Sequence, residues 1–428
     1  MKVVWLCNLN LFPFSEKLGI DKNLFQDQHP VTWITTLYKK FSTYRDIELI
    51  IISTSQFVKK VKQFDSDNVH FIIIPKNRYP FPSRAELNKI FSPLVTWIIR
   101  LVLIIPKRLF KIIKIIDVFT GYRFFVCRVI KIVNRINPDI VHSHGTEFVY
   151  SIPLNYLKLP CIVQTQGLMN SVIAYNSSLL PRLQKRLEDK VFKKQRNFII
   201  NSDFVKKIIK TYNSDAKFWK IFYMIDIDII NALPSVECNT DLVFAAAVNK
   251  GKGIEDLLLA CKLIKFKFPD FKLKIIGYNS TQYLNYLKIL IDEYNLNDNI
   301  KFLGFIPERE EMLMEVKKSK ISVLPTYHDT TPGTISEAMF LGVAVVAYDV
   351  GGIPDMIVQN ESGILVEKGN IDQLAASIIK LMENEDKRIY LIHNAKNRAE
   401  FLYSKDVADE IISAYSEVIE EFKISGNK

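Results

Sequence analysis

The sequence predicts an α/β protein with two domains, each built around a mainly parallel sheet. Three observations lead to this fold class. The chain has 428 residues, more than a single hydrophobic core usually serves. Hydrophobic residues make up 48% of the chain, which is enough for two substantial cores. Short apolar strands alternate with helical patterns along most of the sequence, and this alternation is typical of parallel sheets covered by helices on both faces.

The expected strands are short apolar runs bounded by polar or glycine-containing turns. In the first half they are Val3–Leu6, Glu48–Ile52, Val69–Ile74, Ile140–His142, Cys161–Gln164 and Phe198–Asn201. In the second half they are Leu242–Ala246, Leu273–Ile276, Lys301–Leu303, Ser322–Leu324, Ala344–Tyr348 and Ile364–Val366. These two sets predict Rossmann-like domains over residues 1–225 and 242–404.

Residues 226–241 separate the two expected domains. This segment contains Pro234 and shows little periodicity, which indicates a linker. In an open parallel sheet, ligands bind beyond the carboxyl ends of the strands. Two such domains that face each other leave a cleft between those ends, and we expect the functional site there.

The positive charge of the chain is concentrated in one segment. The formal net charge is +11, and residues 97–136 hold nine Lys and Arg side chains against the single acid Asp117. The segment reads as two amphipathic helices. One interpretation is a pair of surface helices with a solvated basic face. The other is a docking face for an anionic inner membrane leaflet, worth about 1 kcal/mol per cation near the surface.

Composition limits the other partners and the compartment. No apolar run approaches the roughly 20 residues that span a bilayer. No nucleic-acid recognition motif accompanies the basic charge, so we expect no nucleic acid partner. Five scattered cysteines without a C-x-x-C pair, and an N-terminus too short and too soon polar for a signal peptide, favour a reduced cytoplasmic protein without structural zinc.

The segment from Pro325 to Ile357 carries the strongest functional signal. It reads as strand end, polar loop, helix and buried strand. The helix is expected to begin near Thr334, because Pro332 and Gly333 interrupt the chain just before an apolar stripe. Unpaired amides at a helix start suit a phosphate.

Two acids, Asp329 and Glu337, flank this expected helix start. A carboxylate beside a phosphate cradle can accept hydrogen bonds from sugar hydroxyls, so the pair suggests a nucleotide-sugar site. A second interpretation remains open for each residue. Thr334 to Glu337 fits a capping box, in which the glutamate folds back onto the helix start. Asp329 alone fits a turn residue.

The same segment resembles the signature of glycosyltransferase family 4, which comprises retaining enzymes with the GT-B fold. The family has two glutamates eight positions apart, and the second opens an "EAMA.G" motif. Here Glu337, Ala338, Met339 and Gly342 match, while Asp329 replaces the first glutamate. The resemblance implies two domains facing across a cleft and a final helix over 405–428 that crosses back to the first domain. It also implies that Glu337 holds the ribose hydroxyls and that Asp329 contacts the donor sugar.

The resemblance extends to other residues that would bind the donor. Lys252 aligns with a family lysine that reaches the pyrophosphate, and such a cation would stabilise the leaving diphosphate. The family arginine five residues earlier falls on Ala247, and Lys250 is a candidate replacement. Backbone groups at Phe305 would hold the base. Thr331, Gly333 and Thr334 would line the phosphate cradle at the helix start.

The first domain resembles the family more loosely. His144, at the end of an expected strand, would line the cleft against the transferred sugar. His142 and His144 share a strand face, but no third ligand has convincing spacing, so we expect no metal. The Gly-Gly pair that the family carries before its first helix has no counterpart in the aligned segment 29–33.

Taken together, these features predict a retaining hexosyltransferase of surface-polysaccharide assembly, peripheral on the cytoplasmic face of the membrane. Its donor would be a UDP- or GDP-sugar, used without a metal or other cofactor. Its acceptor would be a lipid-linked saccharide. Asp329, His144 and Lys252 would act at the reacting centre. The departures from the family pattern leave two alternatives: a non-catalytic nucleotide-sugar-binding subunit, and another GT-B enzyme such as a sugar-nucleotide epimerase.

Overall fold

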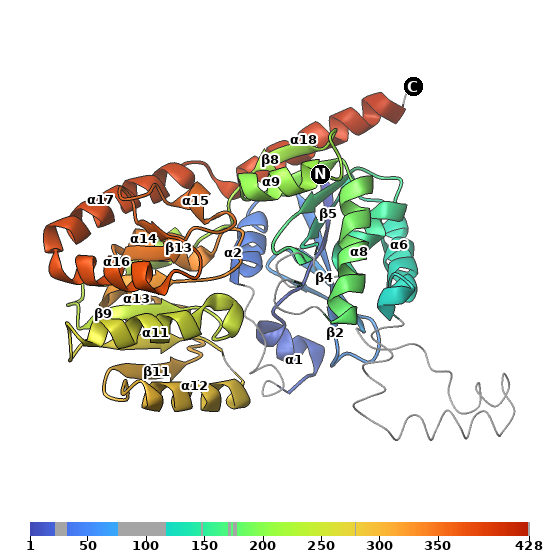
Figure 1. The fold of residues 1–428 in the computed structure, drawn as a ribbon. Helices are drawn as coiled ribbons and strands as arrows, with labels where there is room; N and C mark the ends of the chain where they lie inside the picture. The colour runs from blue at the N-terminus through green and yellow to red at the C-terminus, as the bar shows by residue number, and fades with distance from the viewer. Residues whose placement is uncertain are drawn as a thin grey trace, which may run out of the picture. The chain divides into compact units, whose positions relative to one another are not determined.

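The structure is a computed structural model that describes residues 1–21, 32–75, 117–146, 149–169, 173, 178–278 and 280–426. The chain forms two compact units (Figure 1). The first unit comprises Met1–Ile199, Ile209–Trp219 and Ile411–Lys428, and the second comprises Ile200–Ile208 and Lys220–Glu410. The units are therefore not continuous in sequence, unlike the expected ranges 1–225 and 242–404.

The first unit is built on an eight-stranded sheet, within the part of the chain that the structure describes. Its order is β3-β4-β2-β1-β5-β6-β7-β8. The strands are β1 (Lys2–Leu6), β2 (Glu48–Ser55), β3 (Lys62–Ser66), β4 (Val69–Pro75), β5 (Ile140–His144), β6 (Cys161–Gln164), β7 (Asn197–Ile200) and β8 (Lys217–Lys220). The ladders from β4 through β7 are parallel, whereas β3 pairs antiparallel with β4.

The helices associated with this sheet connect its strands in α/β fashion. They are α1 (Ser15–Leu18), α2 (Thr32–Phe41), α6 (Arg123–Ile136), α8 (Leu179–Lys194) and α9 (Asp203–Lys210), with 3₁₀ turns η1 (Phe12–Phe14) and η3 (Val149–Tyr156). The central strands β1 and β5 are buried along nearly their whole length, as expected for parallel strands covered on both faces. The basic segment 97–136 is described only from residue 117 onward, so all but the last residues of its first expected helix lie outside the described residues.

The second unit is built on a six-stranded parallel sheet of order β11-β10-β9-β12-β13-β14. Its strands are β9 (Thr240–Ala245), β10 (Leu273–Ile276), β11 (Ile300–Gly304), β12 (Ser319–Leu324), β13 (Ala344–Tyr348) and β14 (Ile364–Val366). Its helices are α10 (Ile227–Ala232), η4 (Lys250–Lys252), α11 (Ile254–Lys265), α12 (Thr281–Glu293), α13 (Arg309–Lys317), α14 (Gly333–Leu341), α15 (Ile353–Met356), α16 (Ile371–Glu383) and α17 (Glu385–Leu402). Helix α10 lies within the segment expected to be a linker.

The order of this second sheet reverses between β9 and β12. From β9 the chain moves outward to β10 and β11, and it then returns to β12 on the other side of β9. Right-handed crossovers place the helices of the two directions on opposite faces. Helix α11 packs with α16, and α14 packs with α13 and α17. The helices that follow β9 and β12 therefore lie on opposite faces of the sheet, and open α/β sheets bind ligands at such a point, beyond the strand ends.

Helix α18 (Val407–Gly426) closes the chain and packs on the first unit through its residues from Ile411 onward. The hydroxyl of Tyr415 accepts a hydrogen bond from Trp5 Nε1 over 2.9 Å and lies 2.6 Å from His142 Nδ1. Glu421 forms an ion pair with Lys217. The predicted α/β class with two parallel sheets is confirmed, and so is the return of the C-terminal helix to the first domain.

Each expected strand is present, although several ends differ by a few residues. Two strands were not predicted. Strand β3 is polar and largely exposed, so it lacks the apolar pattern on which the prediction relied. Strand β8 consists of four residues, KFWK, with none fully buried.

Candidate functional site

The loop after β9 is locked in place by glycine. Gly253 has a φ of +73°, and a Cβ atom there would lie 1.8 Å from the carbonyl oxygen of Pro325. The amide of Tyr327 donates to the carbonyl of Gly251 over 2.9 Å. Because any side chain at Gly253 would force the two backbones apart, the loops after β9 and β12 approach closely only with glycine at this position.

This approach brings Lys252 to Asp329. Asn249 accepts a hydrogen bond from the amide of Lys252, which fixes the short η4 turn. Lys252 Nζ then lies 2.5 Å from Asp329 Oδ2, and the two side chains are 28% and 15% exposed. Two residues that sequence analysis assigned to the site are thus brought together, and each retains a solvent-reachable portion.

The two glycines that follow β13, Gly351 and Gly352, also contact the loop carrying Asp329. Gly351 has a φ of +58°, and a Cβ atom there would lie 1.8 Å from the carbonyl oxygen of Asp329. The amide of Gly352 donates to the same carbonyl oxygen over 3.2 Å. The Gly-Gly pair that ends β13 therefore serves the close packing of the Asp329 backbone.

Helix α14 begins directly after this loop, at Gly333 rather than at Thr334. The amides of Gly333 and Thr334 have no carbonyl one turn earlier within the helix, so they are free to bind an anion in the helix dipole. Just before them, the Thr331 hydroxyl is buried without a hydrogen-bond partner among the described residues. A buried hydroxyl beside free amides is a polar corner suited to phosphate oxygens.

Glu337 does not form the capping box that its spacing allows. Within the described residues the N-cap position, Pro332, makes no side-chain hydrogen bond, and Glu337 lies more than a turn into the helix. The carboxylate instead forms an ion pair with Arg309, the first residue of α13. The Glu337 side chain is only 11% exposed.

Arg309 was not among the residues predicted for the site. Arg309 lies five positions after the end of β11, at the start of α13. It follows the loop whose Phe305 was predicted to hold a base through its backbone. A cation shortly after a strand end was the available signal, but nothing in the sequence pairs Arg309 with Glu337, which lies 28 positions later. Phe305 and Lys250 are exposed, and Lys250 makes no ion pair within the described ranges.

His144 lies in the first unit and differs in character from these residues. Its ring centroid is 3.8 Å from that of His142 and 4.7 Å from that of Trp5. Burial lowers the pKa of His144 to about 3, against a weaker opposing effect of Gln164. Burial, reinforced by His144, also lowers the pKa of His142 well below its usual value. Both imidazoles are therefore neutral near pH 7.

The described residues hold neither a metal-binding cluster nor a membrane-spanning helix. Within those ranges no three His, Cys, Asp or Glu side chains are grouped so as to hold a metal ion. The helices in the same ranges include none with the length and apolar character to cross a membrane. The loop aligned with the family's Gly-Gly pair falls mainly in residues 22–31, outside the described residues.

Solved structures share this arrangement of two parallel sheets. Sucrose-phosphate synthase from Thermosynechococcus elongatus matches with a TM-score of 0.74 at 15% sequence identity, over 98% of this chain and 100% of that one. HepE from Anabaena, solved in complex with UDP, matches with a TM-score of 0.66 at 14% identity, over 97% of this chain and 100% of HepE. The protein has the GT-B fold.

Sequence comparison then gives the family. Residues 227–398 match the family described as "Glycosyl transferases group 1", and residues 26–228 match "Glycosyltransferase Family 4". The chain belongs to the group 1, family 4 glycosyltransferases.

Curated relatives are similar over part of their length. The amylovoran biosynthesis glycosyltransferase AmsK of Erwinia amylovora is 28% identical over 173 residues, which is 39% of this chain and 42% of AmsK. The capsular polysaccharide biosynthesis glycosyltransferase CapM of Staphylococcus aureus is 28% identical over 183 residues, 42% of this chain and 46% of CapM. The matched region thus spans less than half the length of these relatives.

Proposed function

We propose that this protein is a retaining glycosyltransferase that moves a hexose-type sugar from a UDP- or GDP-sugar to a lipid-linked saccharide in the assembly of a cell-surface polysaccharide. The proposal rests above all on one observation. The loop carrying Lys252 is locked against the loop carrying Asp329, directly before the free amide end of α14. A cation, a helix start and two acids in one corner suit a diphosphate joined to two sugars.

Each side chain then has a chemical task. The amides of Gly333 and Thr334 and the Thr331 hydroxyl bind the diphosphate. Lys252 turns from Asp329 toward the phosphate oxygens as the bond between the sugar C1 and the diphosphate breaks. The acceptor hydroxyl attacks C1 from the face that the diphosphate leaves, and its proton passes to a phosphate oxygen. The products are the glycoside and the nucleoside diphosphate. Asp329 contacts the sugar, and Glu337 accepts hydrogen bonds from the ribose hydroxyls.

The names of similar proteins support this choice of substrates. HepE has been solved with UDP-glucose, with a TM-score of 0.65 to this chain. AmsK and CapM are named for amylovoran and capsular polysaccharide biosynthesis. A UDP-sugar donor and a polysaccharide precursor as acceptor follow by analogy.

The acceptor and the location are inferred from the basic face of the first unit. Helix α6 buries Val126, Val129 and Val133 and exposes Lys131 and Arg135 on its other side. Phe119, four positions before the first residue of α6, is 79% exposed, and Phe124, the second residue of α6, is 60% exposed. Cations beside exposed aromatic rings suit an anionic leaflet on the cytoplasmic face, where a lipid-linked acceptor would lie.

A two-stage assay tests the proposal. Purified protein is first screened against UDP- and GDP-sugars for a rise in melting temperature, because a ligand that binds the native state stabilises it. The donor found is then incubated with a polyprenyl-diphosphate saccharide, and glycoside is detected by mass spectrometry. A glycoside with retained anomeric configuration is expected. Donor binding without acceptor-dependent product would favour the non-catalytic subunit, and an altered nucleotide sugar would favour the epimerase. Stabilisation by none of the donors would contradict the proposal.

A further inference from the structure

A short segment of the chain lies with the second unit although its neighbours in sequence lie with the first. Residues Ile200–Ile208 contain the end of β7 and the start of α9, and both elements continue into the first unit. This segment contacts the loops that surround Asp329.

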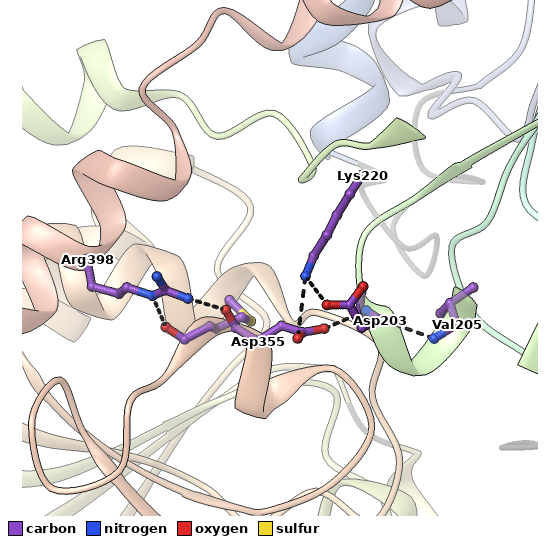
Figure 2. Close-up of polar contacts among 7 residues, drawn as sticks. Asp203, Val205, Lys220, Asp355 and Arg398 are labelled. Carbon is purple, nitrogen blue, oxygen red and sulfur yellow. Dashed lines mark hydrogen bonds and ion pairs between the residues drawn. The ribbon is translucent and has the colours of Figure 1, made fainter. Parts of the chain in front are cut away.

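The most densely bonded of these contacts is made by Asp355 in α15 (Figure 2). Its carboxylate accepts the amide of Asp203 over 2.7 Å and lies 3.4 Å from Lys220 Nζ. Lys220 also donates to Asp203 over 2.8 Å. The carbonyl of Asp355 accepts from Arg398 of α17 over 2.8 Å. The Asp355 side chain is 20% exposed, so these hydrogen bonds are partly shielded from water.

Two further contacts lead from this segment to the site loop. Asn201 Nδ2 donates to the Thr330 hydroxyl oxygen over 3.1 Å, and both residues are buried. A Cβ atom at Gly352 would lie 2.5 Å from Ser202 Cβ and 1.7 Å from the carbonyl oxygen of Thr330. The backbone of Gly352 is thus packed between Ser202 and the loop that carries Asp329.

We infer that Asn201, Ser202 and Asp203, fastened by Asp355, form a positioning element that sets the backbone of the Asp329 loop. The inference rests on the proposed function for the consequence in catalysis, but not for the positioning itself. Asp355 holds the segment, Ser202 packs against Gly352, and Gly352 donates to Asp329. Asn201 reaches the same loop independently through Thr330. The proposed function places none of these residues at the reacting atoms.

The chain offers a matched control for Asp355. Asp241, at the start of β9, accepts the amide of Lys272 over 3.0 Å and pairs with Lys320 over 2.9 Å, with a side chain 21% exposed. It therefore makes the same kinds of contact at similar burial. It lies at the amino end of its strand, away from the carboxyl ends that carry the site.

The first test is amide hydrogen exchange on the full chain, which needs no donor. Asp355→Ala should speed exchange of the Gly352 amide about tenfold or more, because the hydrogen bond from this amide to the Asp329 carbonyl opens more often. Asp355→Asn, which can still accept the Asp203 amide, should restore most of the protection. Asp241→Ala should leave Gly352 unchanged. Unchanged exchange in Asp355→Ala, or an equal rise in Asp241→Ala, would overturn the inference.

The second test measures transfer with the donor found in the screen. Asp355→Ala should lower kcat about tenfold, because small misplacements of a reacting group are costly, while UDP affinity stays within about threefold. We expect kcat to fall without a matching loss of UDP affinity, because α14 is held by its own packing on α13 and α17. A wild-type chain that turns over no donor would count against the proposed function, and the exchange result would still decide the inference. Wild-type activity with kcat equal in both alanine variants would overturn it.

Discussion

The carboxyl ends of the two sheets differ in the kind of polar group they present. In the second unit, Lys252, Asp329, Arg309 and Glu337 are paired as ions and remain between 11% and 28% exposed. At the end of β5 in the first unit, His142 and His144 are buried and neutral. Binding a diphosphate needs charge that water can still reach before the ligand arrives. The neutral imidazoles of the first unit lack that charge, so under the proposed function the diphosphate is expected to bind the second unit.

The two ion pairs, Lys252 with Asp329 and Arg309 with Glu337, also explain how the site of the second unit keeps its charged groups without a ligand. A buried charge without a partner is costly, and each acid of the site is matched by one cation. A diphosphate would take Lys252 from Asp329, and a ribose would share Glu337 with Arg309. Under the proposed function, the site would therefore exchange one set of polar partners for another when the donor binds.

Replacing Lys252 should have the largest effect on transfer, because this residue supplies the charge that distinguishes the second unit from the first. Lys252→Ala removes the cation facing the leaving diphosphate and should lower kcat/KM about 10²- to 10³-fold, as loss of one stabilising group in an active site typically does. Steady-state transfer assays measure it. Lys320→Ala, which removes a lysine paired with Asp241 at the other end of the sheet, is the control. A loss of less than about threefold in Lys252→Ala would show that this lysine does not face the diphosphate.

Replacing Gly351 should test the packing beneath Asp329. Gly351→Ala places a Cβ atom against the Asp329 carbonyl, so we expect about 2–4 kcal/mol of lost stability by urea unfolding. Gly304→Ala is the matched control, since its φ is +72° but a Cβ atom there meets nothing within 4 Å. It should cost about 1 kcal/mol. Equal losses in the two variants would mean that positive φ alone, and not the contact with Asp329, sets the cost.

Variants of Glu337 and Arg309 test whether their ion pair serves recognition of the ribose. Glu337→Gln should weaken donor binding about tenfold, and it should reduce the preference for a ribose donor over its 2′-deoxy analogue. Arg309→Met should reduce that preference too, because the ion pair orients the carboxylate. Isothermal titration calorimetry with both donors measures it. Glu315→Gln, which disturbs a carboxylate paired with Lys274 and Lys318, is the control. Unchanged donor affinity with a lower melting temperature would assign Glu337 to stability alone.

The buried histidines predict the pH dependence of stability. The pKa of His144 is about 3 in the folded chain, whereas an unfolded histidine titrates near 6.5. Below pH 6.5 the unfolded state binds a proton that the folded state refuses, so stability falls as the pH drops toward 3. The slope is at most about 1.4 kcal/mol per pH unit for each such group.

His144→Asn should remove one such contribution and flatten the fall in melting temperature between pH 6.5 and 4.5. Parallel slopes for the wild type and His144→Asn would contradict the buried, neutral assignment of His144.

The sequence predicted what depends on strong local patterns. Buried parallel strands such as Ala344–Tyr348 are continuous apolar runs, so their positions were evident. Strand β3 was missed because it is polar, yet its connection to β4 carries a usable signal. Asp67 and Asn68 form a two-residue turn in which both φ angles are positive, and Asp and Asn tolerate that conformation better than most residues.

The site shows where such patterns fail. Asp329, Glu337 and the start of α14 lie within one strand–loop–helix unit, so the sequence alone could propose them as parts of one site. Lys252 required the family resemblance, since it lies 77 positions before Asp329. Arg309 and Asn201 were missed because their contacts depend on how distant loops pack at the strand ends. The local sequence gives no sign of either contact.

A crystal structure of the chain with UDP would test the central claim most directly. We predict that the diphosphate lies at the start of α14, bonded to the amides of Gly333 and Thr334, with Lys252 turned toward it and Glu337 on the ribose hydroxyls. UDP bound elsewhere, or side chains filling this corner, would contradict the account.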